Sequence, residues 1–327
     1  MSNELLFREL AIKQSLENFT KYILKICLSC WTSGKMWEIA IAAYAFLSFL
    51  NAATVLLMWK TKWEHQNQRY LTINLAVTEM ICCCYMAIRF SVILADNWTE
   101  TWVKVDTMIS IFLYSEHRLS LLHIIADRFL EIFMNMKYTL YMSSKKLVRT
   151  ITCLWLFAFV LALTCLLLRL FNHPDTSLKL GLFTVCGLDV LIILLAVGTY
   201  TYFYLKVKKI RRSVGVTSDW SKQAFSLVWT KFKLPCYISL TYVFFNLIST
   251  IMAAKAFYEQ VHNHNDKEYK RLMYIAIVLD LIGFASDIFI YVFVNRNVRK
   301  QLFTTLKWKT KKTNTISSVE IEQAQIE

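Results

Sequence analysis

Proline and glycine are scarce in this chain, which contains two prolines and six glycines in 327 residues. The connections between its structural elements should therefore be short, because turns and long loops draw heavily on these two residues. Charged residues are also few, at 18%, whereas hydrophobic residues make up 56%. A soluble domain would have about a quarter of its residues charged. The composition favours a protein that crosses a membrane several times.

Motifs of catalysis, metal binding and cofactor binding are missing as well. The sequence shows no zinc-ligand spacing, no nucleophile elbow and no phosphate-binding loop, so we expect no enzyme activity, no metal ion and no cofactor. Cys27 and Cys30 form one Cys-x-x-Cys pair without a second pair nearby, which is weak evidence for a metal site. The formal charge of +14 would suggest nucleic acid for a soluble chain. In a membrane protein it reflects basic cytoplasmic loops, and we expect no nucleic-acid partner.

Seven apolar segments follow one another along the chain, each near the ~20 residues that a helix needs to cross a bilayer. Continuous apolar character of this length favours helices over the strands of a barrel. We therefore predict an all-α membrane protein, a seven-transmembrane helix bundle over residues 36–294. The segments are approximately Met36–Trp59, Tyr70–Leu94, Val103–Met134, Leu147–Leu170, Leu180–Leu205, Phe232–Phe257 and Leu272–Val294.

The distribution of Lys and Arg predicts the orientation. The first, third and fifth loops and the C-terminal tail carry more of these residues than the N-terminal segment and the even loops, so they should be cytoplasmic. Residues 1–35 would then form an extracellular segment of a multi-pass plasma-membrane protein. Two Asn-x-Thr sequons, at Asn18 and Asn97, both fall on the predicted outer side, and we expect both to be glycosylated.

A short amphipathic helix is predicted directly after the last span, over residues 295–308. Val298, Leu302 and Phe303 share one face of it, and Arg299 and Lys300 lie on the other. This pattern is typical of a helix on the inner membrane surface. Residues 309–327 are polar and should form a cytoplasmic tail.

The third apolar segment ends in Asp127-Arg128-Phe129, followed by a basic residue and Tyr138. An Asp-Arg pair at the edge of a membrane should pair internally or face the protein, because a lone charge there is costly. The stretch resembles the Asp/Glu-Arg-Tyr signature of the rhodopsin-like (class A) G-protein-coupled receptors.

Four further landmarks support this resemblance, which covers about residues 36–306. Asn51 resembles the first-span Asn of the family, and residues 74–79 resemble the second-span Asn-Leu-Ala-x-x-Asp, with Glu79 in place of Asp. Trp155 resembles the fourth-span Trp, and residues 287–291 resemble the seventh-span Asn/Asp-Pro-x-x-Tyr.

The resemblance implies a receptor that binds an extracellular small-molecule or peptide ligand and activates a heterotrimeric G protein, with arrestin as a further partner. Asp127 would hold Arg128 at rest, and Arg128 would turn toward the G protein on activation. The implied activation switch comprises Asp127, Arg128, Phe129, Asp287 and Tyr291.

The resemblance also implies a polar cluster inside the membrane at the place where the family holds sodium. Its members here would be Asn51, Glu79, His117 and Asp287. A protonated His117 could replace the sodium ion as the counter-charge to Glu79, or the cluster could serve only to fix helix packing. Both alternatives require these residues to lie close together.

Candidate ligand-pocket residues follow from the same resemblance: Arg89, Asp106, Ser110, Tyr114, Phe245 and Asn246. An ion pair that closes the outer ends of two helices is the simpler interpretation of Arg89 and Asp106. Ser110 stands where amine receptors have Asp, which disfavours a monoamine ligand. Leu281 stands where opsins have Lys, which disfavours a covalent chromophore. The loop between spans four and five, about Phe171–Lys179, is short.

The departures from the family pattern leave other functions open. The helix-bending prolines of spans five, six and seven are missing, and the usual extracellular disulfide cannot form. A seven-span partner or trafficking protein that does not couple to G proteins is therefore an alternative. Polar residues at mid-membrane, among them Glu116 and Arg118, suggest a transporter, but the broken Gly/Pro helices found in many transporters are missing.

Overall fold

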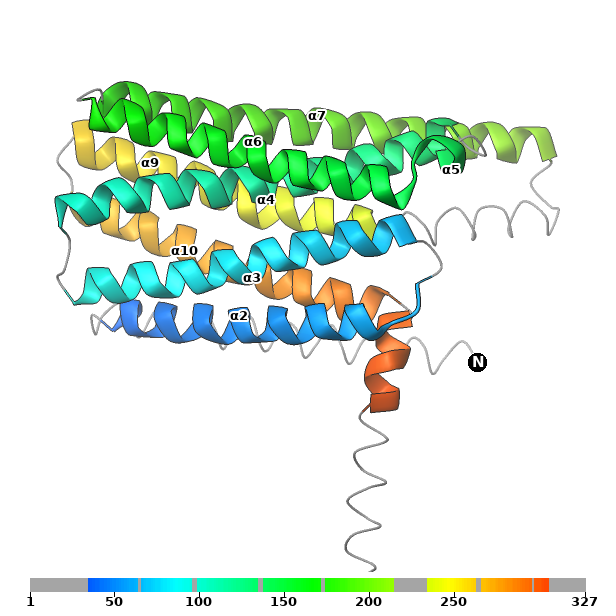
Figure 1. Cartoon of the computed structure of the whole chain (residues 1–327), viewed down its shortest axis with the longest axis horizontal. Helices are drawn as coiled ribbons and strands as arrows, with labels where there is room; N and C mark the ends of the chain where they lie inside the picture. Colours follow the sequence, from blue (N-terminus) through cyan, green and yellow to red (C-terminus); the bar gives the residue numbers. More distant parts are fainter. Residues whose placement is uncertain are drawn as a thin grey trace, which may run out of the picture.

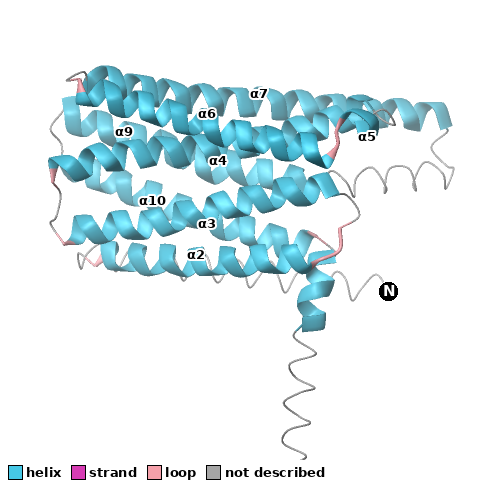
Figure 2. Cartoon of the chain, in the orientation of Figure 1, coloured by secondary structure: helices cyan, strands magenta, loops and turns pink. Residues whose placement is uncertain are grey.

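The computed structural model describes eight stretches of the chain: residues 35–63, 66–95, 99–134, 138–171, 174–214, 234–262, 266–295 and 297–305. Within these stretches the regular structure is helical throughout, which confirms the predicted all-α class (Figure 2). Asn18, Asn97, most of the predicted 1–35 segment and the whole 309–327 tail lie outside the described residues.

The long helices run alongside one another, as Figure 1 shows. A four-residue helix, α5, lies at one end of them, and residues 297–305 form a short helix that runs across the bundle direction in the same figure. The bounds of the elements are α2 (Met36–Lys60), α3 (Gln66–Leu94), α4 (Glu100–Met134), α5 (Tyr138–Tyr141), α6 (Ser144–Leu170), α7 (Pro174–Val214), η2 (Tyr242–Leu247), α9 (Ile248–His262), α10 (Asp266–Phe289) and η3 (Ile290–Val294).

Successive long helices run in opposite directions, so the bundle has two distinct ends. One end holds the C-terminal part of α4, the short helix α5 and the helix of residues 297–305 (Figure 1, right). We call it the Asp127 end. At the opposite end α3, α6 and α9 end, and α4, α7 and α10 begin (Figure 1, left).

Six helical segments in the described residues are long and apolar enough to cross a membrane, namely Met36–Lys60, Gln66–Leu94, Ser144–Leu170, Lys179–Lys206, Leu234–Ala256 and Glu268–Val294. The remaining long helix, α4, spans 35 residues but is less apolar. Its polar residues Glu116, His117 and Arg118 are buried among the other helices, so its polarity does not face lipid.

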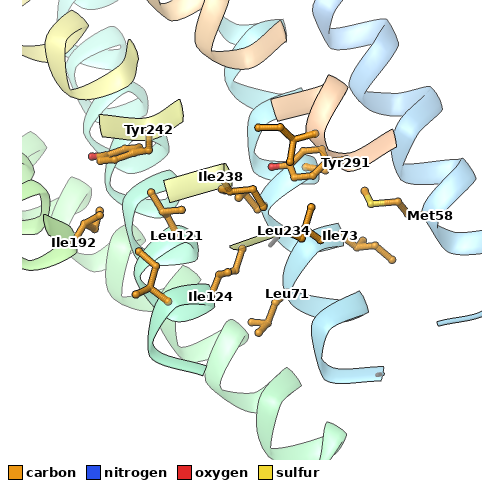
Figure 3. Packing of buried hydrophobic residues seen from close by; sticks show 14 of the residues in the cluster. Met58, Leu71, Ile73, Leu121, Ile124, Ile192, Leu234, Ile238, Tyr242 and Tyr291 are labelled. Atoms are coloured by element: carbon orange, nitrogen blue, oxygen red, sulfur yellow. The ribbon is translucent and has the colours of Figure 1, made fainter. Parts of the chain in front are cut away.

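Two large hydrophobic clusters and a smaller one, of Leu119, Ala158 and Leu188, fill the interior between the helices. The cluster nearer the Asp127 end packs Leu121 and Ile125 of α4 with Ile238, Tyr242 and Tyr291 (Figure 3). The other cluster, toward the opposite end, contains a group of aromatic residues contributed by α2, α3 and α10, which are Trp37, Tyr44, Phe90, Tyr274 and Phe284.

The connections are even shorter than the sequence predicts. The predicted extent of the loop between spans four and five, Phe171–Lys179, is wrong, because α7 already begins at Pro174. Proline is favoured at the first helical position, where its fixed φ suits the helix and its missing N–H has no partner to lose. At the other end of the bundle, Asn295 begins the final helix, and its side-chain oxygen accepts from the backbone N–H groups of Asn297 (3.0 Å) and Val298 (3.3 Å).

Two π-helical turns interrupt the last two spans. They are η2 (Tyr242–Leu247) and η3 (Ile290–Val294), and η3 begins directly before Tyr291 of the motif that lacks its proline. A bulge of this kind is one of the few causes of a helix bend other than proline, and π turns occur mostly at functional sites. The chain therefore has local irregularities in two of the three spans in which the receptor family uses prolines.

Gly283 of α10 allows the sixth and seventh spans to approach closely. A Cβ atom added there would meet the amide oxygen of Asn246, and would lie 3.2 Å from Asn246 Cγ and 3.3 Å from Phe245 Cβ. The amide is buried and cannot swing into solvent.

We expect Gly283→Ala to destabilise the purified protein by about 1–3 kcal/mol, because overpacking forces the two spans apart. Thermal unfolding in detergent should show a lower midpoint. Gly198→Ala in α7 is the matched control, since nothing lies within 4 Å of the added methyl group. Equal midpoints for the two variants would show that the close approach is not required.

Candidate functional site

Arg128 is buried at the Asp127 end of α4, with 2% of its surface exposed. Its guanidinium forms ion pairs with Asp127 and with Glu131, one turn further along the same helix. The phenol of Tyr138, from α5, donates a hydrogen bond to the second carboxylate oxygen of Asp127. Arg128 is thus paired with two acidic residues of its own helix, and Tyr138 of α5 donates a hydrogen bond to one of them, Asp127.

Tyr138 is itself fixed by α3. The amide of Asn67 donates to the Tyr138 hydroxyl (3.2 Å) and to the carbonyl oxygen of Met142 (3.2 Å). Burial raises the pKa of the Tyr138 phenol, and the neighbouring Asp127 carboxylate raises it further. Tyr138 therefore keeps its proton and remains a donor to Asp127.

Phe129, the third residue of the motif, does not belong to this ion-pair group. It stacks on Phe133 with ring centroids 5.9 Å apart and meets the ring of Tyr202 from α7 at 6.1 Å. Phe129 therefore contributes to an aromatic contact between α4 and α7.

Asp287 and Tyr291, the other two residues of the predicted switch, lie in a second group deeper in the bundle. Tyr291 donates to Glu79 Oε1 of α3 (2.8 Å), and Thr241 donates to Asp287 Oδ1 (2.7 Å). His117 Nε2 lies 3.8 Å from the same Glu79 oxygen, which is too far for a hydrogen bond. Glu79 therefore accepts from the tyrosine hydroxyl and not from His117, and it is also hydrogen-bonded to Asp287.

Asn51 is buried in α2, but its amide has no hydrogen-bond partner within the described part of the chain. Of the four residues predicted for the polar cluster, the structure brings Glu79, His117 and Asp287 together. It does not join Asn51 to them by a hydrogen bond.

A third group links α4, α7 and the sixth span through Arg118. Its Nε donates to Asp189 Oδ1 of α7 (2.6 Å), one terminal nitrogen donates to Thr250 Oγ1 (2.8 Å), and the other donates to the carbonyl oxygen of Tyr114 (3.1 Å). Tyr242 of η2 donates to the same Asp189 oxygen. Asp189 was missed by the sequence reasoning, although a carboxylate inside the apolar stretch Leu180–Leu205 is itself a signal of a buried partner.

Glu116 faces another direction, toward α3 and α6. Ser120 donates to Glu116 Oε1 (2.9 Å), the amide of Asn74 donates to Ser120 (2.7 Å), and the indole of Trp155 donates to Asn74 (3.0 Å). This chain of hydrogen bonds joins three helices and accounts for the Asn74 and Trp155 landmarks together.

Near the opposite end of the bundle, Arg89 and Asp106 form an ion pair between α3 and α4 (3.0 Å). Tyr85 donates to Asp106 and lies 3.3 Å from the hydroxyl of Ser110. This geometry agrees with the simpler of the two interpretations, a pair that joins two helices near their ends.

Two small adjoining cavities lie deeper than this ion pair, of about 10 and 20 Å³, each little more than the space for one water molecule. The first is lined by Ser110 and Tyr114, and the second by Tyr114 and Asn246, so three of the six predicted pocket residues line them. Arg89, Asp106 and Phe245 line neither of these two cavities. Asp280, which lines the second cavity, was not among the predicted residues.

The apolar, all-helical bundle with a polar interior is that of a multi-pass membrane protein. Residues 44–173, from α2 to the turn after α6, match the family described as Serpentine type 7TM GPCR chemoreceptor Srx. This part of the chain is thus similar to a divergent GPCR-like family of chemoreceptors. No curated protein matches the chain.

Breaking the Arg118–Asp189 pair should be strongly destabilising. Asp189→Asn leaves a buried guanidinium without its counter-charge, and we expect a loss of about 3–5 kcal/mol. The double variant Arg118→Met, Asp189→Leu should recover part of this loss, because it removes both charges. Thermal unfolding of the purified variants measures the coupling.

Lys104→Ala is the control, because it removes the exposed Lys104–Glu100 pair at the start of α4. It should leave the unfolding midpoint unchanged, since surface pairs contribute little. A double variant that unfolds as early as the sum of its single variants would mean that the two charges do not stabilise each other.

Proposed function

We propose that this protein is a plasma-membrane chemoreceptor that binds an extracellular small molecule and activates a heterotrimeric G protein. Its N-terminus lies outside the cell, and the Asp127 end of the bundle faces the cytoplasm. The observation that carries the proposal is the enclosed Arg128 at that end, in a chain that matches a chemoreceptor family.

The described conformation has the features of a resting state. Arg128 is 2% exposed and is held by Asp127 and Glu131, so it cannot contact a protein from the cytoplasm. Activation would release it by shifting the bundle toward a second arrangement that the ligand binds more tightly. A shift from 1:99 to 99:1 requires a difference of about 5.5 kcal/mol in binding free energy between the two arrangements.

The Arg118 group can carry this shift from the ligand cavity to the Asp127 end. Arg118 and Thr250 line the second cavity, and Arg118 also holds Asp189 of α7. Tyr242, the partner of Asp189, packs in the hydrophobic cluster toward the Asp127 end (Figure 3). A ligand that displaces Arg118 would therefore act on α4, α7 and the sixth span at once.

The two alternative functions lose part of their motivation. The missing prolines suggested a seven-span protein that does not couple, but π-helical turns are present in the sixth and seventh spans. The mid-membrane charges suggested a transporter, but Arg118 is paired with Asp189 of α7, and Glu116 is linked to Asn74 of α3 through Ser120. These contacts favour a fixed packing role over an ion path.

Arg128→Ala should abolish ligand-independent and ligand-driven G-protein activation while the protein still reaches the cell surface. The measurement is a set of G-protein dissociation sensors in cells that express an epitope-tagged chain, first without any ligand. Arg149→Ala, an exposed arginine of α6 near the same end, is the matched control and should signal normally.

Arg128→Lys tests whether charge alone is enough, because lysine keeps the cation but not the two-sided fork of the guanidinium. We expect it to fold and to signal weakly. Full signalling by Arg128→Ala, at equal surface level, would refute the proposed role, and arrestin recruitment without any G-protein response would favour the non-coupling alternative.

The orientation is tested by the two sequons. Asn18→Gln and Asn97→Gln should each remove one glycan, seen as a faster-migrating band that enzymatic deglycosylation no longer shifts as far. The double variant should migrate as a single unglycosylated species. A glycan on only one of the two sites would not establish the orientation, whereas an epitope accessible at the C-terminus of intact cells would contradict it.

A further inference from the structure

Two carboxyl groups from different helices meet inside the bundle. Glu79 of α3 and Asp287 of α10 are buried, with 0% and 2% of their surfaces exposed, and they are hydrogen-bonded to each other. An ionised carboxylate has acceptor oxygens and no donor, whereas a protonated carboxyl has one O–H donor. A hydrogen bond between the two side chains therefore requires a proton on one of them.

The other hydrogen bonds of the two carboxyls come from neutral groups. Tyr291 donates to Glu79 Oε1 (2.8 Å), and Thr241 donates to Asp287 Oδ1 (2.7 Å). The buried arginines of α4 form their ion pairs with other acidic residues. Two ionised carboxylates in contact, away from water and without a cation between them, repel each other strongly. Ionisation of both groups is therefore a poor description of this contact.

His117 of α4 is the basic side chain beside this pair in the described part of the chain. Its Nε2 lies 3.8 Å from Glu79 Oε1, which is too far for a hydrogen bond. A histidinium at this position would also be buried beside the positive charge of Arg118. His117 is thus poorly placed to supply the counter-charge of Glu79.

Glu79 contacts the seventh span on both sides of the point where its π turn begins. Asp287 precedes Ile290, the first residue of η3, and Tyr291 lies within η3. Both side chains are hydrogen-bonded to the one carboxyl group of Glu79. The bond between the two acids therefore helps to position the irregular turn of the seventh span against α3.

We propose that Glu79 and Asp287 bind a single proton between them, and that this shared proton holds α3 against the start of the π turn in the seventh span. The pair then carries one negative charge instead of two, and a charge-assisted O–H···O hydrogen bond joins the two helices. A proton thus takes the place for which a sodium ion or a protonated His117 was considered. The shared proton is a property of the folded bundle and does not require coupling to a G protein.

Asp287→Asn supplies an amide N–H that donates to Glu79 without any bound proton. Thermal unfolding of the purified full chain in lipid nanodiscs should give a midpoint within about 2 °C of the unmodified protein, and Glu79→Gln should behave in the same way. Asp287→Ala removes the donor and should lower the midpoint by at least about 4 °C. Asp189→Asn is the matched control, because the same change at a carboxylate paired with Arg118 should lower the midpoint strongly.

Infrared difference spectra detect the proton itself. At neutral pH the unmodified protein should show the carbonyl stretch of a protonated carboxylic acid, which shifts in D₂O. The difference spectrum against Asp287→Asn, and equally against Glu79→Gln, should contain one such band. Glu100→Gln is the control, because Glu100 is an exposed carboxylate at the start of α4, and its difference spectrum should contain carboxylate bands alone.

Three results would overturn the shared proton. The first is a fall in midpoint for Asp287→Asn as large as that for Asp189→Asn, and the second is a difference spectrum with carboxylate bands alone. The third is a midpoint that rises with sodium chloride but not with choline chloride at the same concentration, which would assign the counter-charge to sodium. These measurements involve no G protein, so the shared proton can fail while the receptor function stands, and the reverse holds as well.

Discussion

The structure depends on one constraint: charged side chains of α4 lie at bilayer depth and must find their partners on other helices. Neighbouring positions on a helix point about 100° apart, so Glu116, His117 and Arg118 face three different directions. Glu116 reaches the Asn74 and Trp155 chain, His117 lies beside Glu79, and Arg118 reaches Asp189. Three consecutive residues thus fix the rotation of α4 and place it at the centre of the bundle.

These contacts fix the arrangement of the helices more than they add to stability. Removing two charges from water costs several kcal/mol for each ion, and the attraction between them only roughly compensates. The contacts nevertheless discriminate against any rotation or shift of α4, because every such change separates a buried charge from its partner. A bundle held in this way has few arrangements that are acceptable, which suits the proposed receptor function, in which the bundle switches between two defined states.

The sequence was sufficient for the helices and for residues close together along the chain. The apolar segments, the Asp127–Arg128 pair and the Arg89–Asp106 pair near two helix ends could all be anticipated from composition and spacing. Asp189 and Asp280 could not be assigned to partners, because a span that faces both lipid and protein is apolar on all sides and its pattern does not reveal its rotation. The π-helical turns were unpredictable for a related reason: Tyr242–Leu247 carries no residue that demands an extra backbone position.

The division between engaged and unengaged polar groups decides where specificity can arise. Arg118 donates from every guanidinium nitrogen to groups of the protein, so a ligand gains little by approaching it. Asn246 has no hydrogen-bond partner within the described residues, whereas Asp280 has Ser249 as a hydrogen-bond partner and Arg118 nearby. A group that binds the Asn246 amide removes an existing cost, and an analogue that lacks it leaves that cost in place. Asn246 lies in the π-helical turn of the sixth span, so a ligand that binds it acts directly on an irregular part of that helix.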